Sequence, residues 1–162
     1  MSIPTATAEY MAPEVLEYLE KVSKKPQAKP QLTRSLYENS NSWSFDIWSF
    51  GIILLEIVTG FPVWMPTSKL LTANGKAKVG EGLFATSHRK PHLIIKAQQN
   101  LVANLIPELQ AKDHYGLTTI PELTDLLSHM LTINPKSRIS PKDILDHPFC
   151  RNHSSSSSCH GQ

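Results

Sequence analysis

One apolar stretch near the middle of the chain limits the folds that are open to this sequence. Residues 47–58 read IWSFGIILLEIV, and the large apolar side chains leave no polar face wide enough for a surface helix. A helix that is apolar on nearly every side must be covered by other elements, and Gly60 stands where such a helix would end. The stretch is too short to span a bilayer and contains Glu56. The sequence therefore predicts a buried central helix.

Shorter amphipathic segments are available to cover this helix. The spacing of their apolar residues predicts helices over 12–20, 92–105 and 121–131. A last short helix is expected after Ser140, which stands at the N-cap position with Pro141 at the first helical position. No pair of segments alternates well enough to predict paired strands. We therefore expect a mainly α fold.

Three other stretches are expected to be irregular. Residues 21–42 contain two prolines and several lysines, which favours a solvated, mobile loop. Residues 65–91 are rich in glycine and proline and are also interpreted as loop. Residues 150–162 contain a run of serines, which predicts a disordered tail. The expected domain therefore covers residues 1–149, with two irregular insertions.

The composition narrows the class of protein. The chain has 162 residues, the size of one domain, and its 16 basic and 14 acidic residues give a net charge of only +2. That charge does not indicate a nucleic-acid or membrane partner. Cys150 and Cys159 are the only cysteines and cannot form a disulfide framework. The first residues have neither a basic region nor an apolar run. We expect an intracellular, most simply cytoplasmic, protein.

Three separated blocks resemble, in order, parts of the C-terminal lobe of Ser/Thr protein kinases. They are ATAEYMAPE at 6–14, DIWSFG at 46–51, and NPKSRI at 134–139 followed by HPF at 147–149. The resemblance covers residues 5–149 apart from the irregular stretches. It implies the helical C-terminal lobe of an α+β kinase fold, from the end of the activation segment through the last helices. The N-terminal lobe and the catalytic loop would be missing from this polypeptide.

The resemblance also implies a substrate-docking loop near the start of the sequence. Its residues would be Thr7, Ala8, Glu9, Tyr10 and Met11. Tyr10 and Met11 would line the pocket for the substrate residue that follows the phosphoacceptor. Each position has a plainer alternative: Thr7 as a turn or cap residue, and Tyr10 and Met11 as ordinary packing against the central helix.

The resemblance also implies structural roles for two further sets of residues. Glu14 is implied to pair with Arg138, as a carboxylate and a guanidinium can in a bidentate fork. Asp46, Trp48 and Gly51 are implied to anchor the central helix. Taken by itself, Asp46 is an acid just before a helix, where the helix dipole favours it.

The residues that phosphoryl transfer needs are not identified in this sequence. The family uses a glycine-rich loop, a strand lysine, a catalytic-loop aspartate and a metal-binding aspartate, all expected before residue 5. Residues 80–85 imitate a phosphate-binding loop, but no clear strand precedes them. His88 and His92 are separated by Pro91 and are not expected to form a zinc pair. We identify no catalytic, cofactor-binding or metal-binding residue; ATP and Mg²⁺ would serve a complete family member.

Two functional interpretations remain open. The chain is either part of a Ser/Thr kinase, a family that transfers the γ-phosphate of ATP to protein substrates, or a short pseudokinase that acts as a protein-binding scaffold or regulator. In either case we expect this polypeptide alone to be inactive. We also expect a protein partner, or a missing kinase segment, to cover the central helix. Without it Trp48, Phe50 and Leu54 would face water.

Overall fold

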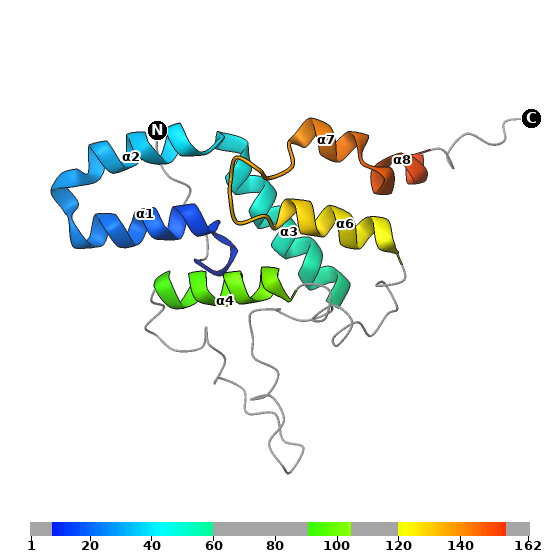
Figure 1. The fold of residues 1–162 in the computed structure, drawn as a ribbon, viewed down its shortest axis with the longest axis horizontal. Coiled ribbons are helices and arrows are strands. Elements are labelled where there is room, and N and C mark those ends of the chain that lie inside the picture. The colour runs from blue at the N-terminus through cyan, green and yellow to red at the C-terminus, as the bar shows by residue number, and fades with distance from the viewer. Residues whose placement is uncertain (1–7, 60–90, 105–119, 155–162) are drawn as a thin grey trace, which may run out of the picture.

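The computed structural model describes residues 8–59, 91–104 and 120–154 (Figure 1). These residues are mainly helical, and none of them belongs to a strand. The elements follow in this order: η1 (Ala8–Tyr10), α1 (Pro13–Lys24), η2 (Pro26–Ala28), α2 (Lys29–Asn39), α3 (Ser42–Thr59), α4 (Pro91–Ala103), α6 (Pro121–Met130), α7 (Pro141–Asp146) and α8 (Pro148–Ser154).

Helix α3 is the centre of the arrangement. Figure 1 shows it crossing the molecule, with the α1–α2 pair on one side and α6, α7 and α8 on the other. Helix α4 packs along α1, and α6 packs against α3. None of the described helices combines the length and apolarity that a membrane span requires.

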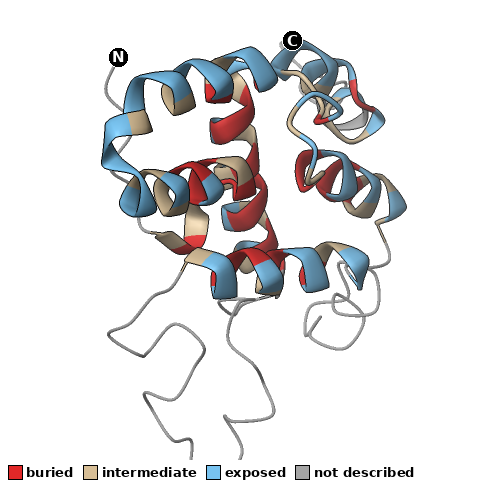
Figure 2. Cartoon of the chain, turned by 60° about the vertical axis from the view of Figure 1, so that its left-hand side comes forward, coloured by how far each residue is buried: buried red, intermediate tan, exposed pale blue. Residues whose placement is uncertain are grey.

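The core is built around the buried face of α3. Trp48 and Ile52 are completely buried, and Leu55 is nearly so. Leu16 of α1 and Leu127 of α6 belong to the same cluster. Figure 2 shows the buried residues running along α3 and along the sides of the neighbouring helices that face it. The cover expected from the short amphipathic helices is confirmed for this face.

The helices expected from apolar spacing are present. The expected segments 92–105 and 121–131 correspond to α4 and α6. Helix α7 begins as expected, since the Oγ atom of Ser140 accepts a hydrogen bond from the backbone N–H of Asp143 at 3.2 Å. The first helix extends four residues beyond the expected end at residue 20, to Lys24.

The loop expected over residues 21–42 is wrong. This segment contains the end of α1, the short η2 turn, helix α2 and the first residue of α3. Pro26 opens η2 and Pro30 lies in the first turn of α2. A proline there costs nothing, because the first N–H groups of a helix have no partner within it. The prolines that suggested a loop therefore mark helix starts.

Two other irregular stretches are only partly described. Residues 150–154, expected to be part of a disordered tail, belong to α8, so that expectation is wrong for them. Residues 155–162 lie outside the described residues. Residues 65–90 also lie outside them, and Pro91 begins α4.

Helix α3 begins earlier than expected and is not covered on every side. It starts at Ser42, so Asp46 is exposed in its second turn instead of standing before it. Phe50, Ile53 and Ile57 follow Asp46 along one face and are 51%, 44% and 68% exposed. We call these four residues the α3 stripe. One face of α3 is therefore exposed among the described residues, in line with the expectation that this polypeptide alone does not cover the whole helix.

The expectation that Trp48, Phe50 and Leu54 would face water is only partly correct. Phe50 is exposed, as expected, but Trp48 is completely buried and Leu54 is half-buried. Trp48 points into the core because it lies almost opposite the α3 stripe on the helix.

Gly51 lies where α3 comes closest to the end of α6. A Cβ atom at this position would be 2.9 Å from Cδ2 of Leu131 and 3.1 Å from Cβ of Met130. Leu131 and Met130 are both completely buried, so neither has free space into which it could move. Glycine therefore permits the contact between α3 and α6.

We expect Gly51→Ala to destabilise the fold even though alanine is the better helix former. Alanine would contribute about 1 kcal/mol through helix propensity, whereas overpacking a tight contact costs about 1–3 kcal/mol. The expected result is a lower denaturant midpoint at unchanged slope. Asp46→Ala, at an exposed position of the same helix, is the control and should change stability by less than about 0.5 kcal/mol. A higher midpoint for Gly51→Ala would contradict the close contact.

Candidate functional site

The loop segment 8–11 is attached to two helices by its backbone oxygens. The Oγ atom of Ser49 on α3 donates to the carbonyl oxygen of Tyr10 at 2.8 Å. The Nε2 atom of Gln98 on α4 donates to the carbonyl oxygen of Met11, also at 2.8 Å. Glu9 is buried, whereas Tyr10 and Met11 are half-buried. Thr7, the first residue of the expected docking loop, lies outside the described residues.

The side chain of Tyr10 adds a third attachment. Its hydroxyl donates to Oε2 of Glu56 on α3 at 2.8 Å. This hydrogen bond to the carboxylate raises the pKa of Tyr10 above its ordinary value of 10.0, with smaller contributions from burial and from the Glu56 charge. Tyr10 therefore holds the loop segment through a hydroxyl that stays protonated at neutral pH.

Gln98 is a site residue that the sequence did not reveal. It is completely buried, and its Oε1 atom has no hydrogen-bond partner among the described residues. The spacing of leucines and isoleucines predicted α4, but an amide on the buried side of that helix gave no separate signal. A fully buried amide costs free energy unless it makes hydrogen bonds, and here one bond goes to the loop segment.

Arg138 and Glu14 meet in a bidentate fork. Nη1 of Arg138 lies 2.8 Å from Oε1 of Glu14, and Nη2 lies 3.1 Å from Oε2. The side chain of Arg138 is completely inaccessible to solvent, while that of Glu14 is 13% exposed. The two residues are 124 positions apart in the sequence. The fork therefore joins the start of α1 to the segment between α6 and α7.

Backbone oxygens satisfy the remaining donors of Arg138. Nε donates to the carbonyl of Thr132 at 3.0 Å, Nη1 to that of Ser44 at 2.6 Å, and Nη2 to that of Ile133 at 3.3 Å. With the two bonds to the carboxylate, these use all five N–H groups of the guanidinium. The group is thus buried with its charge paired and every donor satisfied.

The three residues expected to anchor α3 lie in different environments. Trp48 lies beneath the guanidinium of Arg138, whose Cζ atom is 5.1 Å from the ring centre, within the range of a cation–π contact. Gly51 faces the end of α6. Asp46 is exposed at the head of the α3 stripe. The structure places Trp48 against Arg138, but it does not place Asp46 against Trp48 or Arg138.

The described contacts hold the loop segment 8–11 in one position. The loop segment 8–11 is held by α3 and α4, and the Arg138–Glu14 fork holds the beginning of α1, which follows the loop. The described residues around it supply hydrogen bonds and packing. This geometry can present a loop in a fixed conformation to another molecule.

Comparisons with known proteins identify relatives of this chain. A sequence model described as the protein kinase domain matches residues 1–150. The Schizosaccharomyces pombe serine/threonine-protein kinase ppk23 is 31% identical over 109 residues, covering 64% of this chain and 26% of that protein. Mouse mitogen-activated protein kinase 12 is 28% identical over 109 residues, covering 64% of this chain and 28% of that kinase.

A third relative carries a name that describes it as probably inactive. A probable inactive serine/threonine-protein kinase of Dictyostelium discoideum is 27% identical over 111 residues, covering 68% of this chain and 10% of that protein. The chain thus spans roughly a quarter or less of the length of these relatives.

We expect Arg138→Ala to cost about 3–5 kcal/mol of folding free energy, because it leaves the Glu14 carboxylate and several carbonyls without their partner. Arg138→Lys should also be poorly tolerated, since an ammonium cannot form the fork or five donor bonds. Chemical denaturation monitored by circular dichroism measures both changes.

The matched control for this prediction is Arg34→Ala. Arg34 bonds to Glu38 at 2.7 Å, but both side chains are exposed, so its loss should cost at most about 1 kcal/mol. An Arg138→Ala chain that unfolds at the same midpoint as the Arg34→Ala chain would show that the fork does not hold the fold together.

Proposed function

This chain belongs to the protein kinase domain family, and we propose that the described residues form the substrate-docking side of a Ser/Thr kinase C-terminal lobe. The observation that supports this most strongly is the Arg138–Glu14 fork. It joins the sequence that follows the loop segment to the last helices, at the two positions that the resemblance to Ser/Thr kinases implies.

In this proposal the loop segment 8–11 receives the protein substrate. Tyr10 and Met11 line the pocket for the residue after the phosphoacceptor, and three hydrogen bonds from α3 and α4 keep them in place. A loop fixed before the substrate arrives loses little conformational entropy on binding. The proposed activity is therefore phosphoryl transfer to Ser or Thr, to which these residues contribute substrate positioning.

We further propose that residues 1–162 do not carry out this reaction without additional kinase segments, on the same or another polypeptide. We do not identify in them a glycine-rich loop with its strand lysine, or the aspartates that act as base and metal ligand. ATP and Mg²⁺ would be bound by those additional segments.

The α3 stripe is the surface that these segments would cover. It combines an exposed carboxylate at Asp46 with three exposed apolar side chains along one face of α3. A carboxylate at the head of an apolar stripe can accept hydrogen bonds from the backbone N–H groups of another segment. The apolar side chains of that segment can then pack against the stripe. Ser49 and Glu56, which hold the loop segment, lie on the neighbouring face of α3.

A second candidate function is supported by the same stripe. A pseudokinase scaffold would use exposed apolar side chains to bind a protein partner, without phosphoryl transfer. One relative of this chain is named a probable inactive serine/threonine-protein kinase, which is compatible with this second candidate.

We expect the purified 162-residue chain to show no magnesium-dependent binding of ATP, because the phosphate and metal ligands are not identified in it. Isothermal titration calorimetry with ATP and excess Mg²⁺ measures this, and titration of ATP without Mg²⁺ is the control. Magnesium-dependent binding in the micromolar range would refute the proposal that further segments supply the nucleotide site.

We expect the α3 stripe to make the isolated chain bind a hydrophobic dye or self-associate. Replacing Ile53 and Ile57 together by serine should reduce both effects, because it removes the apolar surface that drives them. Leu145→Ser is the matched control, since Leu145 on α7 is 73% exposed but lies outside the stripe.

Dye fluorescence and light scattering provide the two measurements. If the parent chain is monomeric and does not bind the dye, or if Leu145→Ser has the same effect as the double variant, the stripe is not the binding surface.

A further inference from the structure

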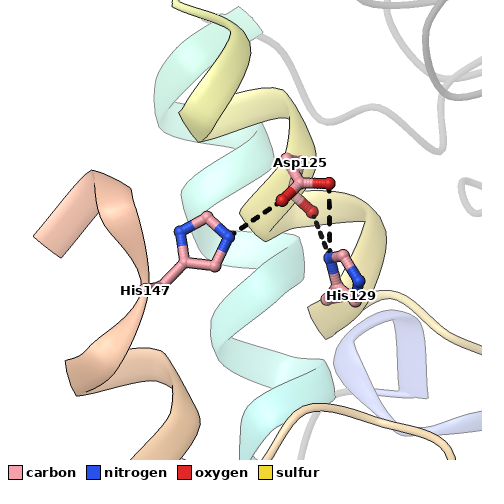
Figure 3. A group of neighbouring side chains, drawn as sticks. All are labelled: Asp125, His129 and His147. Carbon is pink, nitrogen blue, oxygen red and sulfur yellow. Dashed lines mark hydrogen bonds and ion pairs between the residues drawn. The ribbon is translucent and has the colours of Figure 1, made fainter.

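Two histidines and an aspartate come together at the junction between the last helices and α6. Asp125 and His129 are four residues apart on α6 and therefore project from the same face of that helix. His147 stands between α7 and α8 and faces them (Figure 3). Neither the docking-loop proposal nor the Arg138–Glu14 fork uses any of these side chains.

The three side chains converge on a small volume. Nε2 of His147 lies 3.0 Å from Oδ2 of Asp125, and Nδ1 of His129 lies 3.6 Å from Oδ1 of the same carboxylate. One nitrogen from each ring and one carboxylate oxygen all lie within 4.8 Å of one another. Tetrahedral ligands at about 2.0–2.2 Å from zinc lie about 3.3–3.6 Å apart, so these atoms are already close to the spacing that an ion requires.

We propose that Asp125, His129 and His147 form a binding site for a divalent transition-metal ion of the zinc type. Two imidazoles and one carboxylate are a donor set that zinc accepts, with a fourth position left for water. Asp125 and His129 are exposed, which gives the ion a path from solvent, whereas His147 is buried and has little freedom to move. The ion would connect α6 to the α7–α8 junction.

Without metal, the same atoms are held by hydrogen bonds. Nδ1 of His147 accepts a bond from the backbone N–H of Phe149 at 3.3 Å, so Nε2 carries the proton that Asp125 accepts. Nδ1 of His129 lies 2.9 Å from the carbonyl oxygen of Asp125 and donates to it.

Binding therefore moves one proton on each ring. The proton of His129 moves to its other nitrogen, and the proton of His147 moves to Nδ1 at the cost of the long bond from Phe149. Each ring remains neutral and offers the lone pair that the metal requires. The metal-free network is thus a competitor that lowers the affinity, and it keeps the ligands close together.

Calorimetric titration of zinc chloride into the full chain tests the site. Cys150→Ser and Cys159→Ser are introduced throughout, so that thiols do not compete for the ion. We expect one bound zinc ion per chain and a rise in Tm with zinc concentration. His129→Gln should weaken binding by more than about tenfold, because even indirect partners of metal ligands are worth 10–100-fold. Since His129 is exposed, this variant should keep the fold.

His92→Gln is the matched control. His92 on α4 is also an exposed histidine beside a carboxylate, 3.9 Å from Glu20, but the part of the chain that the structure describes gives it no third ligand. Zinc binding should be unchanged in this variant and lost in Asp125→Asn. The proposal is overturned if the parent chain does not bind zinc, if His129→Gln binds it as well as the parent, or if His92→Gln loses it equally. In the first two cases the three side chains form a hydrogen-bonded network only.

Discussion

The buried guanidinium of Arg138 is the interaction on which the rest of this structure depends. Moving such a charge out of water costs several kcal/mol, and that cost is offset only when the charge is paired and each donor is satisfied. Here Glu14 provides the opposite charge, and three backbone carbonyls, one on α3 and two in the segment that follows α6, accept the remaining bonds. Glu14 and Ser44 are 124 and 94 positions from Arg138 in the sequence, so the guanidinium can be satisfied only when α1 and α3 are both packed against the segment that follows α6.

Trp48 shows what this arrangement costs. Its ring packs beneath the Arg138 guanidinium, but its Nε1–H is buried and has no acceptor among the described residues. An unsatisfied buried donor costs about 1–3 kcal/mol, which burial of so large a ring can offset at about 25 cal/mol per Å². Trp48 is thus buried beside Arg138 with its ring packed and its donor unsatisfied among the described residues.

The helices could be predicted from sequence because apolar spacing follows the core, as at Leu123, Leu127 and Leu16. The pattern wrongly predicts a loop over residues 21–42 because prolines such as Pro26 and Pro30 usually interrupt helices. Here a proline lies within the first two positions of each of η2, α2, α6 and α7, where a helix tolerates it. The Glu14–Arg138 pair was expected only from family resemblance, since spacing alone cannot join positions 124 apart. The HPF block draws attention to His147, but its approach to Asp125 on α6 cannot be predicted from the sequence because it depends on the turn between α7 and α8.

The α3 stripe connects the fold to its proposed function. A helix as apolar as α3 is stable in water only where neighbours cover it, yet Phe50, Ile53 and Ile57 remain substantially exposed. The loop segment is bonded to the adjoining face of the same helix through Ser49 and Glu56. A molecule that covers the stripe must therefore lie beside the loop segment. In the proposed function, helix α3 would thus hold the loop segment and a molecule bound to the stripe in one fixed relation, because both contact the same helix.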